Sequence, residues 1–145
     1  MYLRYFAELK QYIPEETDPI EQWYDERYGY ADQLQKFYIY ANKCIVGFVI
    51  LQYVDKSYGI NPPIWYVVEF YILPEYRRKG FGIKTVETVL DMCGGNAFLY
   101  ILKDNKPAMD FWDAAEFRLH LFRSFRSDLA CDDGVEIRII GKADC

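Results

Sequence analysis

The sequence predicts a mixed α/β or α+β domain in which helices pack on one central sheet. Its 145 residues are enough to bury one core and too few for two ordinary domains, so we expect residues 1–145 to form a single domain. Apolar residues make up 52% of the chain and charged residues 27%, which excludes a disordered or collagen-like protein. Helical and strand patterns also alternate along the chain, as they do where helices cover a sheet.

The N-terminal third is interpreted as a helix followed by a hairpin. The first six residues, MYLRYF, fit either a short strand or the start of a helix. Residues 18–35 begin with Asp-Pro and carry apolar side chains at helical spacing, which predicts a helix broken near Gly29. Residues 36–54 predict two strands joined by a tight turn at Asn42-Lys43.

The remaining chain predicts a central strand followed by alternating helices and strands. Residues 64–73 form a continuous β-branched and aromatic run that ends at Pro74, which is typical of a strand buried on both faces. Apolar side chains then recur at helical spacing up to Cys93, where Gly94-Gly95 ends the helix. The later elements expected are a strand at 97–102, a helix at 105–117 and closing strands at 118–125 and 135–141.

The charge of the chain is unevenly distributed. The net charge of −5 argues against a nucleic-acid or anionic-membrane binder, because such proteins need positive charge to neutralise phosphates. Residues 74–84, however, hold four bases against one acid. One short stretch is therefore suited to an anion while the rest of the chain is not.

The cysteines and the N-terminus favour a reducing cytoplasm. The four cysteines form no CxxC motif and the chain has one histidine, so we expect no metal site. Cys44 and Cys93 lie in apolar runs and are predicted to be core residues. The N-terminus has no apolar stretch of the signal-peptide type, and no segment approaches the ~20 apolar residues of a membrane helix.

The most informative segment is ILPEYRRKGFGIKTVETVL, in which a buried strand leads through a basic turn into a helix. A helix N-terminus offers free backbone N–H groups and a positive dipole end. Gly80 and Gly82 allow close approach of a ligand, and Arg77, Arg78 and Lys79 add positive charge. These features predict a pyrophosphate site, with a tight connection carrying solvated bases as the alternative.

Two nucleotide-binding patterns fit this segment poorly. The dinucleotide pattern GxGxxG fails because position 85 is Thr, and no GK[ST] follows for a P-loop. RRKGFG instead resembles the Arg/Gln-x-x-Gly-x-Gly/Ala signature of the GCN5-related N-acetyltransferases (GNAT). NKPAMDFW resembles the Asn-x-x-Ala stretch that follows the fifth strand of that family, and IVGFVIL its third strand. The resemblance covers about residues 36–117.

This resemblance implies a fold and a co-substrate. GNAT enzymes splay two parallel strands, the fourth and fifth, and hold acetyl-coenzyme A between them, with helices on both faces of a mixed sheet. Here those strands would be 64–73 and 97–102. The backbone of Tyr71, Ile72 and Leu73 would contact the pantetheine arm as an added strand. The cofactor-binding residues implied in total are Ile72, Leu73, Arg77, Arg78, Lys79, Gly80, Phe81, Gly82, Asn105 and Trp112.

The implied reaction transfers the acetyl group to a primary amine by direct attack. Glu69 is the candidate base, because a carboxyl inside so apolar a strand is costly to bury; a structural carboxyl is the alternative. A backbone N–H near Ile72 would stabilise the oxyanion. Many GNAT enzymes protonate the leaving thiolate with a tyrosine where this chain has Trp112, whose indole is no usable acid. Either the thiolate then leaves unassisted, or a tyrosine on a strand that would line the site acts as the acid. Tyr71 is the first candidate, Tyr66 and Tyr100 are the others, and core packing is the alternative role for each.

The sequence leaves the acceptor and two other functions open. A small-molecule or peptide amine is expected. An aromatic segment would line its pocket, pack in the core or form a homodimer face; its members are Trp23, Tyr24, Tyr28 and Tyr30. The alternatives to an enzyme are a non-catalytic acyl-coenzyme A-binding module and a site for another phosphate ligand such as a nucleotide.

Overall fold

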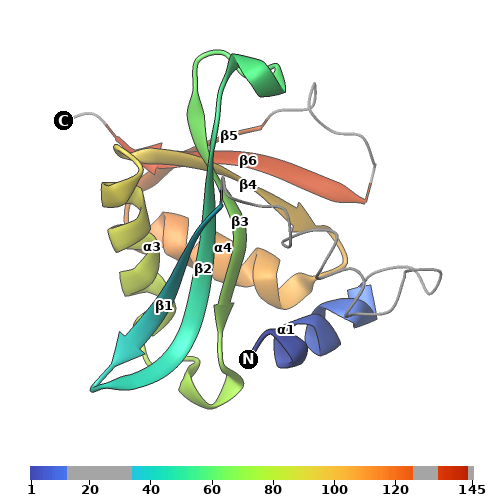
Figure 1. Cartoon of the computed structure of the whole chain (residues 1–145), viewed down its shortest axis with the longest axis vertical. Coiled ribbons are helices and arrows are strands. Elements are labelled where there is room, and N and C mark those ends of the chain that lie inside the picture. The colour runs from blue at the N-terminus through green and yellow to red at the C-terminus, as the bar shows by residue number, and fades with distance from the viewer. Residues whose placement is uncertain (13–33, 126–133, 144–145) are drawn as a thin grey trace.

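The computed structural model describes residues 1–12, 34–125 and 134–143 (Figure 1). Residues 2–6 belong to a helix that Met1 precedes as N-cap, which decides between the two alternatives left by the sequence. The helices are α1 (Tyr2–Leu9), α3 (Phe81–Met92) and α4 (Lys106–Arg118), with short 3-10 turns at Lys10–Tyr12, Lys56–Tyr58 and Pro74–Tyr76. The strands are β1 (Leu34–Ala41), β2 (Cys44–Val54), β3 (Ile64–Ile72), β4 (Asn96–Leu102), β5 (Leu121–Phe125) and β6 (Val135–Lys142).

The six described strands form one mixed sheet in the order β1-β2-β3-β4-β6-β5. Only β3 and β4 are parallel; the other neighbours are antiparallel. The predicted turn between β1 and β2 is confirmed, because Asn42 and Lys43 both have positive φ, 49° and 69°, as a two-residue hairpin turn requires. The mixed sheet expected from the sequence is therefore present.

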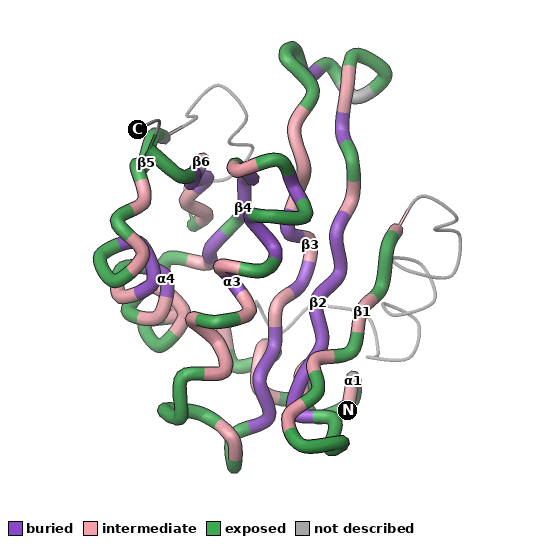
Figure 2. Tube along the Cα trace, turned by 90° about the vertical axis from the view of Figure 1, so that its left-hand side faces the viewer, coloured by how far each residue is buried: buried purple, intermediate pink, exposed green. Residues whose placement is uncertain are grey.

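Helices cover both faces of this sheet, as predicted. Figure 2 shows α3 and α4 on one side of the strands and α1 on the other. The larger core lies under α3 and α4 and includes Val67, Val89, Leu99 and Ala115. On the opposite face Phe6 of α1, which is 2% exposed, packs with Phe48, Ile50 and Tyr71.

Two local predictions are wrong. The stretch 118–125 was expected to be a strand throughout, but α4 continues to Arg118 and a turn follows, in which His120 has a φ of 53°. Leu119 closes the helix by donating its N–H to the carbonyl of Ala115, so β5 begins only after the turn. Cys93 is buried as expected, whereas Cys44 is exposed because it starts β2 beside the hairpin turn.

The helix expected at 18–35 and the aromatic segment of residues 23–30 fall outside the described residues, apart from positions 34 and 35, which begin β1. Within the described residues no helix is long and apolar enough to cross a membrane. These residues also gather no group of three metal-ligating side chains.

A buried ionic network fastens α4 to the sheet. Arg138 of β6 is 1% exposed and donates from Nη1 to Asp113 (2.8 Å) and Glu116 (3.1 Å) of α4 and from Nε to Glu136 (3.0 Å). Arg123 of β5 binds the same two carboxylates of α4. Buried charges persist only when they are paired, so this network fixes the position of α4 on β6.

Replacing Arg138 by Met should lower the free energy of unfolding by about 3 kcal/mol, because the buried carboxyl of Glu116 loses a charged partner. Urea denaturation measures the loss. The control is Lys106→Gln, which breaks an exposed pair with Asp110 and should change the free energy by less than about 0.5 kcal/mol. Equal losses in the two variants would contradict the structural role of the network.

Candidate functional site

The two parallel strands, β3 and β4, pair over a short stretch and then diverge, which splits the sheet. β3 and β4 pair only at Tyr66 with Phe98 and at Val67 with Leu99. Beyond these residues β3 follows β2 as far as Ile72, and β4 follows β6 as far as Leu102. In Figure 1 the β1–β3 half accordingly runs vertically while β4–β6 run across it. The splay predicted for these two strands is therefore present.

A β-bulge lies at the point of divergence. Ile50 of β2 pairs with Glu69 and the next residue, Leu51, pairs with Val67, so that Val68 is the extra residue on β3. A bulge bends and twists the strand that contains it. The bend turns β3 away from β4 directly after the last shared pair, which accounts for the opening.

The opening exposes a backbone edge of β3 that no described strand covers. The N–H of Leu73 donates to the carbonyl of Val46 on β2 at 2.8 Å. Because N–H directions alternate along a strand, the N–H groups of Ile72 and Phe70 point to the other side, into the split. Ile72 therefore suits its predicted role, whereas the N–H of Leu73 is already used within the protein.

The helix at the end of this edge begins without a side-chain cap. Gly80 is the N-cap of α3, with a φ of 89°, and it has no side chain to bond the first amides. The first backbone bond of the helix runs from Lys84 to Gly80, so residues 81–83 present N–H groups outside that ladder. Arg78 and Lys79 are exposed beside them and form no ion pair with any described residue. This turn has the donors and the charge that a phosphate group needs.

Arg77 and Tyr71 face away from this turn. The Nε of Arg77 donates to the carbonyl of Ile72 (2.7 Å) and its Nη2 to Glu8 of α1 (2.8 Å). The hydroxyl of Tyr71 donates to the same Glu8 at 2.6 Å. Burial, followed by this hydrogen bond, raises the pKa of Tyr71 to about 12. A phenol with that pKa is a poor proton donor, so the geometry argues against Tyr71 as the acid and against Arg77 as a phosphate ligand.

Gly82 has a packing role that the sequence did not reveal. A Cβ at this position would lie 2.6 Å from the ring of Phe111, so glycine lets the first turn of α3 approach α4. Phe111 and Trp112 in turn contact Phe70 on β3, with ring centroids 5.4 and 5.3 Å apart. Trp112 is 7% exposed and belongs to the core. These aromatic side chains fill the α3–α4 face of the split.

Asn105 caps the helix on the far side of the split. Its Oδ1 accepts the N–H of Ala108 at 3.2 Å, which satisfies one of the first amides of α4. The side chain is half-buried at the end of the turn that follows β4. It therefore orients α4 and lies at the edge where the sequence places the cofactor arm.

Glu69 lies on the face covered by α1. Its cross-strand partner Ile50 and its neighbour Val68 both belong to the α1-side cluster, and cross-strand partners share a face. The side chain is 5% exposed, and burial raises the pKa of its carboxyl well above the ordinary value. A carboxyl with a raised pKa at the bulge is suited to proton transfer next to the split.

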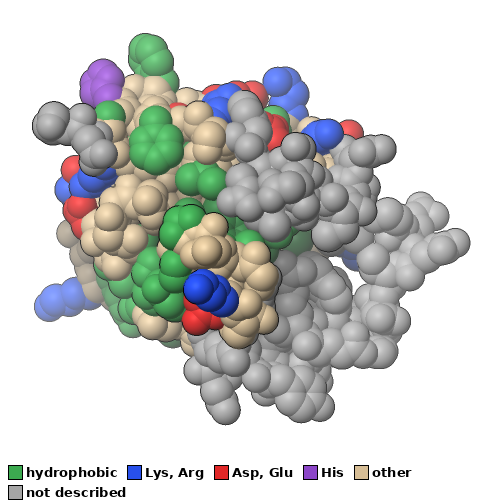
Figure 3. Space-filling model, turned by 90° about the horizontal axis from the view of Figure 1, so that it is seen from above, with side chains coloured by type: hydrophobic (Ala, Val, Ile, Leu, Met, Phe, Trp, Pro, Cys, Tyr) green, Lys and Arg blue, Asp and Glu red, His purple; other side chains and the backbone are tan. Residues whose placement is uncertain are grey.

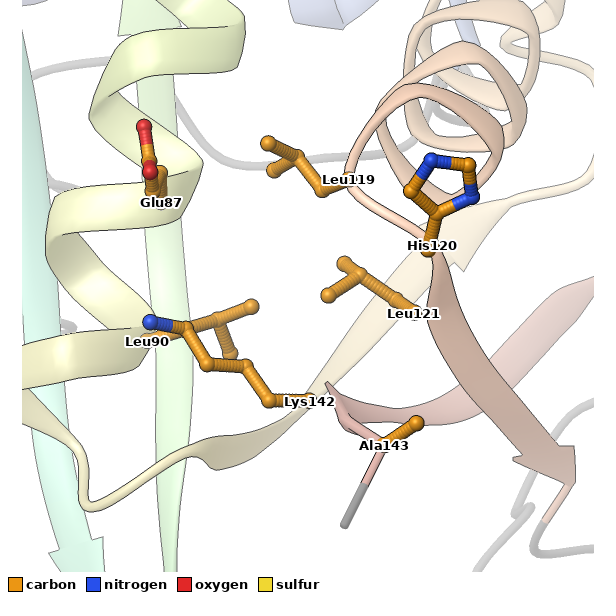
Figure 4. Close-up of a pocket in the computed structure, with 7 residues that line it drawn as sticks. All are labelled: Glu87, Leu90, Leu119, His120, Leu121, Lys142 and Ala143. Atoms are coloured by element: carbon orange, nitrogen blue, oxygen red, sulfur yellow. The ribbon is translucent and has the colours of Figure 1, made fainter. Parts of the chain in front are cut away.

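A shallow cavity of about 310 Å³ lies elsewhere, between the second half of α3 and the turn that contains His120. Figure 4 shows Leu119 and Leu121 pointing across it toward Leu90, with Glu87 and Lys142 at its rim. Figure 3 views the molecule from the end opposite the β3–α3 turn, where acidic and basic side chains are interspersed over the described surface. The lysine at this cavity, Lys142, pairs with Asp91, whereas the adjacent exposed bases Arg78 and Lys79 of the β3–α3 turn pair with no described acid.

The sequence profile of the Acetyltransferase (GNAT) family matches residues 3–117. The chain belongs to the GNAT family. No curated protein matches it. Solved GNAT structures share its fold at low identity. PaiA N-acetyltransferase from Thermoplasma acidophilum, in complex with coenzyme A, has a TM-score of 0.60 at 17% identity, over 92% of this chain and 83% of that one.

Two further structures extend the comparison across GNAT proteins. An acetyltransferase from Thermus thermophilus has a TM-score of 0.61 at 13% identity, over 94% of this chain and 81% of that one. An aminoglycoside acetyltransferase from an uncultured soil metagenomic sample, in complex with sisomicin, has a TM-score of 0.55 at 16% identity, over 79% and 76%. The likeness to all three concerns the GNAT fold.

Glu69 yields a prediction about stability. Its pKa is raised by burial in the folded state, against an ordinary value of roughly 4.3 in the unfolded chain. Its contribution to stability is therefore complete below about pH 4 and is lost as the pH rises through the folded pKa. Glu69→Gln should thus become more stable than the wild type as the pH rises, with the difference smallest near pH 4.

Urea denaturation of both proteins from about pH 2 to pH 9 measures this difference. Asp55→Asn serves as a control of opposite sign, because hydrogen bonds from Ser57 lower the pKa of Asp55. Its carboxylate should stabilise the wild type increasingly as the pH rises through the acid range. A pH-independent difference for Glu69→Gln would show that the carboxyl does not titrate abnormally.

Proposed function

We propose that this protein transfers the acetyl group of acetyl-coenzyme A to a primary amine carried by a small molecule or a peptide. The observation that carries the proposal is the juxtaposition of an open strand edge and an uncapped helix N-terminus. The edge of Ile72 and Phe70 matches the amide-bearing pantetheine arm, which can pair with it as an added strand. The amides at the start of α3, with Arg78 and Lys79, match the diphosphate.

The chemistry assigned to the site is direct attack. The amine nitrogen forms a bond to the thioester carbon, the carbon–sulfur bond breaks, and the amine proton passes through water to the carboxylate of Glu69. In this proposal the backbone N–H of Ile72, which the alternation along β3 directs into the split, stabilises the oxyanion. The thiolate leaves without a protein acid, because Trp112 is a core residue and Tyr71 donates to Glu8.

A non-catalytic acyl-coenzyme A-binding module is the second candidate. Trp112 favours it, since many GNAT enzymes have an acidic tyrosine hydroxyl at that position and this chain has a buried indole. The two candidates share the cofactor site and differ only in turnover. Binding of acetyl-coenzyme A without release of free thiol, across a panel of primary amines, would favour the module.

Gly80→Val should abolish the binding of acetyl-coenzyme A, because the new side chain would stand among the amides that hold the diphosphate. Isothermal titration calorimetry measures the loss. Gly59→Val is a matched control: Gly59 has a φ of 76° with no atom within 4 Å of a Cβ, as at Gly80, but it lies at the other end of the sheet. Both variants carry a similar backbone strain of about 1–3 kcal/mol. If Gly80→Val bound acetyl-coenzyme A with wild-type affinity, the proposed phosphate site at the start of α3 would be wrong.

Glu69→Gln should lower kcat by about 10²-fold or more at the pH optimum and remove the limb of the rate profile that rises with pH, because Gln cannot accept the amine proton. Release of free thiol from acetyl-coenzyme A, followed over pH with the amine panel, measures both effects. Affinity for acetyl-coenzyme A should stay unchanged. Full activity of the variant at every pH would show that Glu69 is not the base.

A further inference from the structure

Helix α1 is tied to the β3–α3 turn by two ion pairs of opposite polarity. Arg4 donates from both terminal nitrogens to the two carboxylate oxygens of Glu75, each at 3.0 Å. One helical turn later the order is reversed, since Glu8 on the helix accepts from Arg77 in the turn. The turn residues of the two pairs, Glu75 and Arg77, lie just before Gly80, where the proposed phosphate site begins.

The carboxylate of Glu8 connects α1 with the end of β3 and with the β3–α3 turn. Its Oε1 accepts the hydroxyl of Tyr71 at the end of β3, and its Oε2 accepts Nη2 of Arg77. The guanidinium of Arg77 lies 5.2 Å from the ring centroid of Tyr71 and also donates to the carbonyl of Ile72. The position of Ile72, whose N–H faces the split, is thus coupled through Arg77 to a carboxylate on α1.

We propose that Glu8 is a positioning residue for acyl-coenzyme A binding, and that α1 acts through it and through Arg4 to hold the turn in its binding conformation. This inference rests on the proposed function. The turn contains two residues in the left-handed region, Arg78 (φ 59°) and Gly80 (φ 89°). Glycine adopts this region freely, whereas a non-glycine residue such as Arg78 stays there only where surrounding contacts fix it, and the contacts from α1 to Glu75 and Arg77 are well placed to do so.

These polar contacts are separable from the docking of α1 itself. Phe6 is buried against Phe48, and Tyr5 packs edge-on against Phe48 and at 5.2 Å from Tyr71. Burial of these apolar side chains supplies most of the energy that holds the helix on the sheet. Loss of the ion pairs should therefore loosen the turn while the helix remains in place.

The first test compares Glu8→Gln with the wild type. Glutamine keeps an oxygen that can accept the Tyr71 hydroxyl but removes the charge that holds Arg77. We expect the Kd for acetyl-coenzyme A to rise about tenfold, the equivalent of one charge-assisted hydrogen bond, with little change in the urea midpoint. Amide hydrogen exchange of residues 74–82 should be faster in the variant without ligand, which a purely global destabilisation would not produce.

The second test is a charge exchange, which does not depend on how well Glu8→Gln folds. Arg4→Glu and Glu75→Arg should each weaken binding about threefold, and the double variant should recover to within about twofold of the wild type because the pair is restored in reverse. Asp91→Asn is the control, since it breaks a surface pair with Lys142 at the far end of α3 and should leave the Kd unchanged.

The outcomes separate this inference from the proposed function. Unchanged Kd and unchanged exchange in Glu8→Gln, with normal binding by the wild type, would overturn the role of Glu8 alone. Single charge variants that lose affinity without recovery in the double variant would overturn the role of the Arg4–Glu75 pair. A wild-type protein that does not bind acetyl-coenzyme A would overturn the proposed function, and this inference with it.

Discussion

The site depends on a single extra residue in β3. Val68 has no partner on β2, and the bulge that it forms bends β3 away from β4 after only two shared residue pairs. Without that bend the parallel pair would continue, and the N–H of Ile72 would be used by the sheet. Unpaired backbone groups inside a protein are costly, by about 1–3 kcal/mol each. The groups along this open edge must bond a ligand or water, and this need is the reason why the proposed site is placed at the split.

The divergence is braced on both faces of the sheet by different physical means. On one face Phe70, Phe111 and Trp112 fill the space between β3 and α4, and the buried Arg138 network fastens α4 to β6. On the other face the contacts of Glu8 are polar and half-exposed. Both faces have close-packed apolar clusters, and the half-exposed ion pairs of α1 add contacts at the turn that depend on charge. The conformation of the turn before α3 therefore depends in part on the charge of Glu8.

The sequence predicted those parts of the site that are encoded locally. The strand 64–73, the glycine turn and α3 each follow from patterns within about ten residues, and the structure places them as expected. The bulge was missed because Glu69 is the one charged residue of β3, so no alternation of polar side chains reveals a change of face. Glu8 was missed for another reason: its partners Tyr71 and Arg77 are more than 60 residues away, and no local pattern encodes that pairing. Gly82 was predicted to bind the cofactor, which stays a prediction, and the structure adds a packing reason for glycine because a Cβ there would lie 2.6 Å from the ring of Phe111.

The placement of Glu69 has a consequence for the direction of attack. The amides of α3 lie at the end of the sheet where the diphosphate would bind, and α3 covers one face, whereas Glu69 lies on the face of α1. Under the proposed function the thioester passes through the split, and the amine reaches it from the α1 side. Burying a carboxyl there lowers stability at neutral pH, because its charged form is poorly solvated. The same burial makes it a stronger base, so the cost to the fold and the benefit to proton transfer have one physical origin.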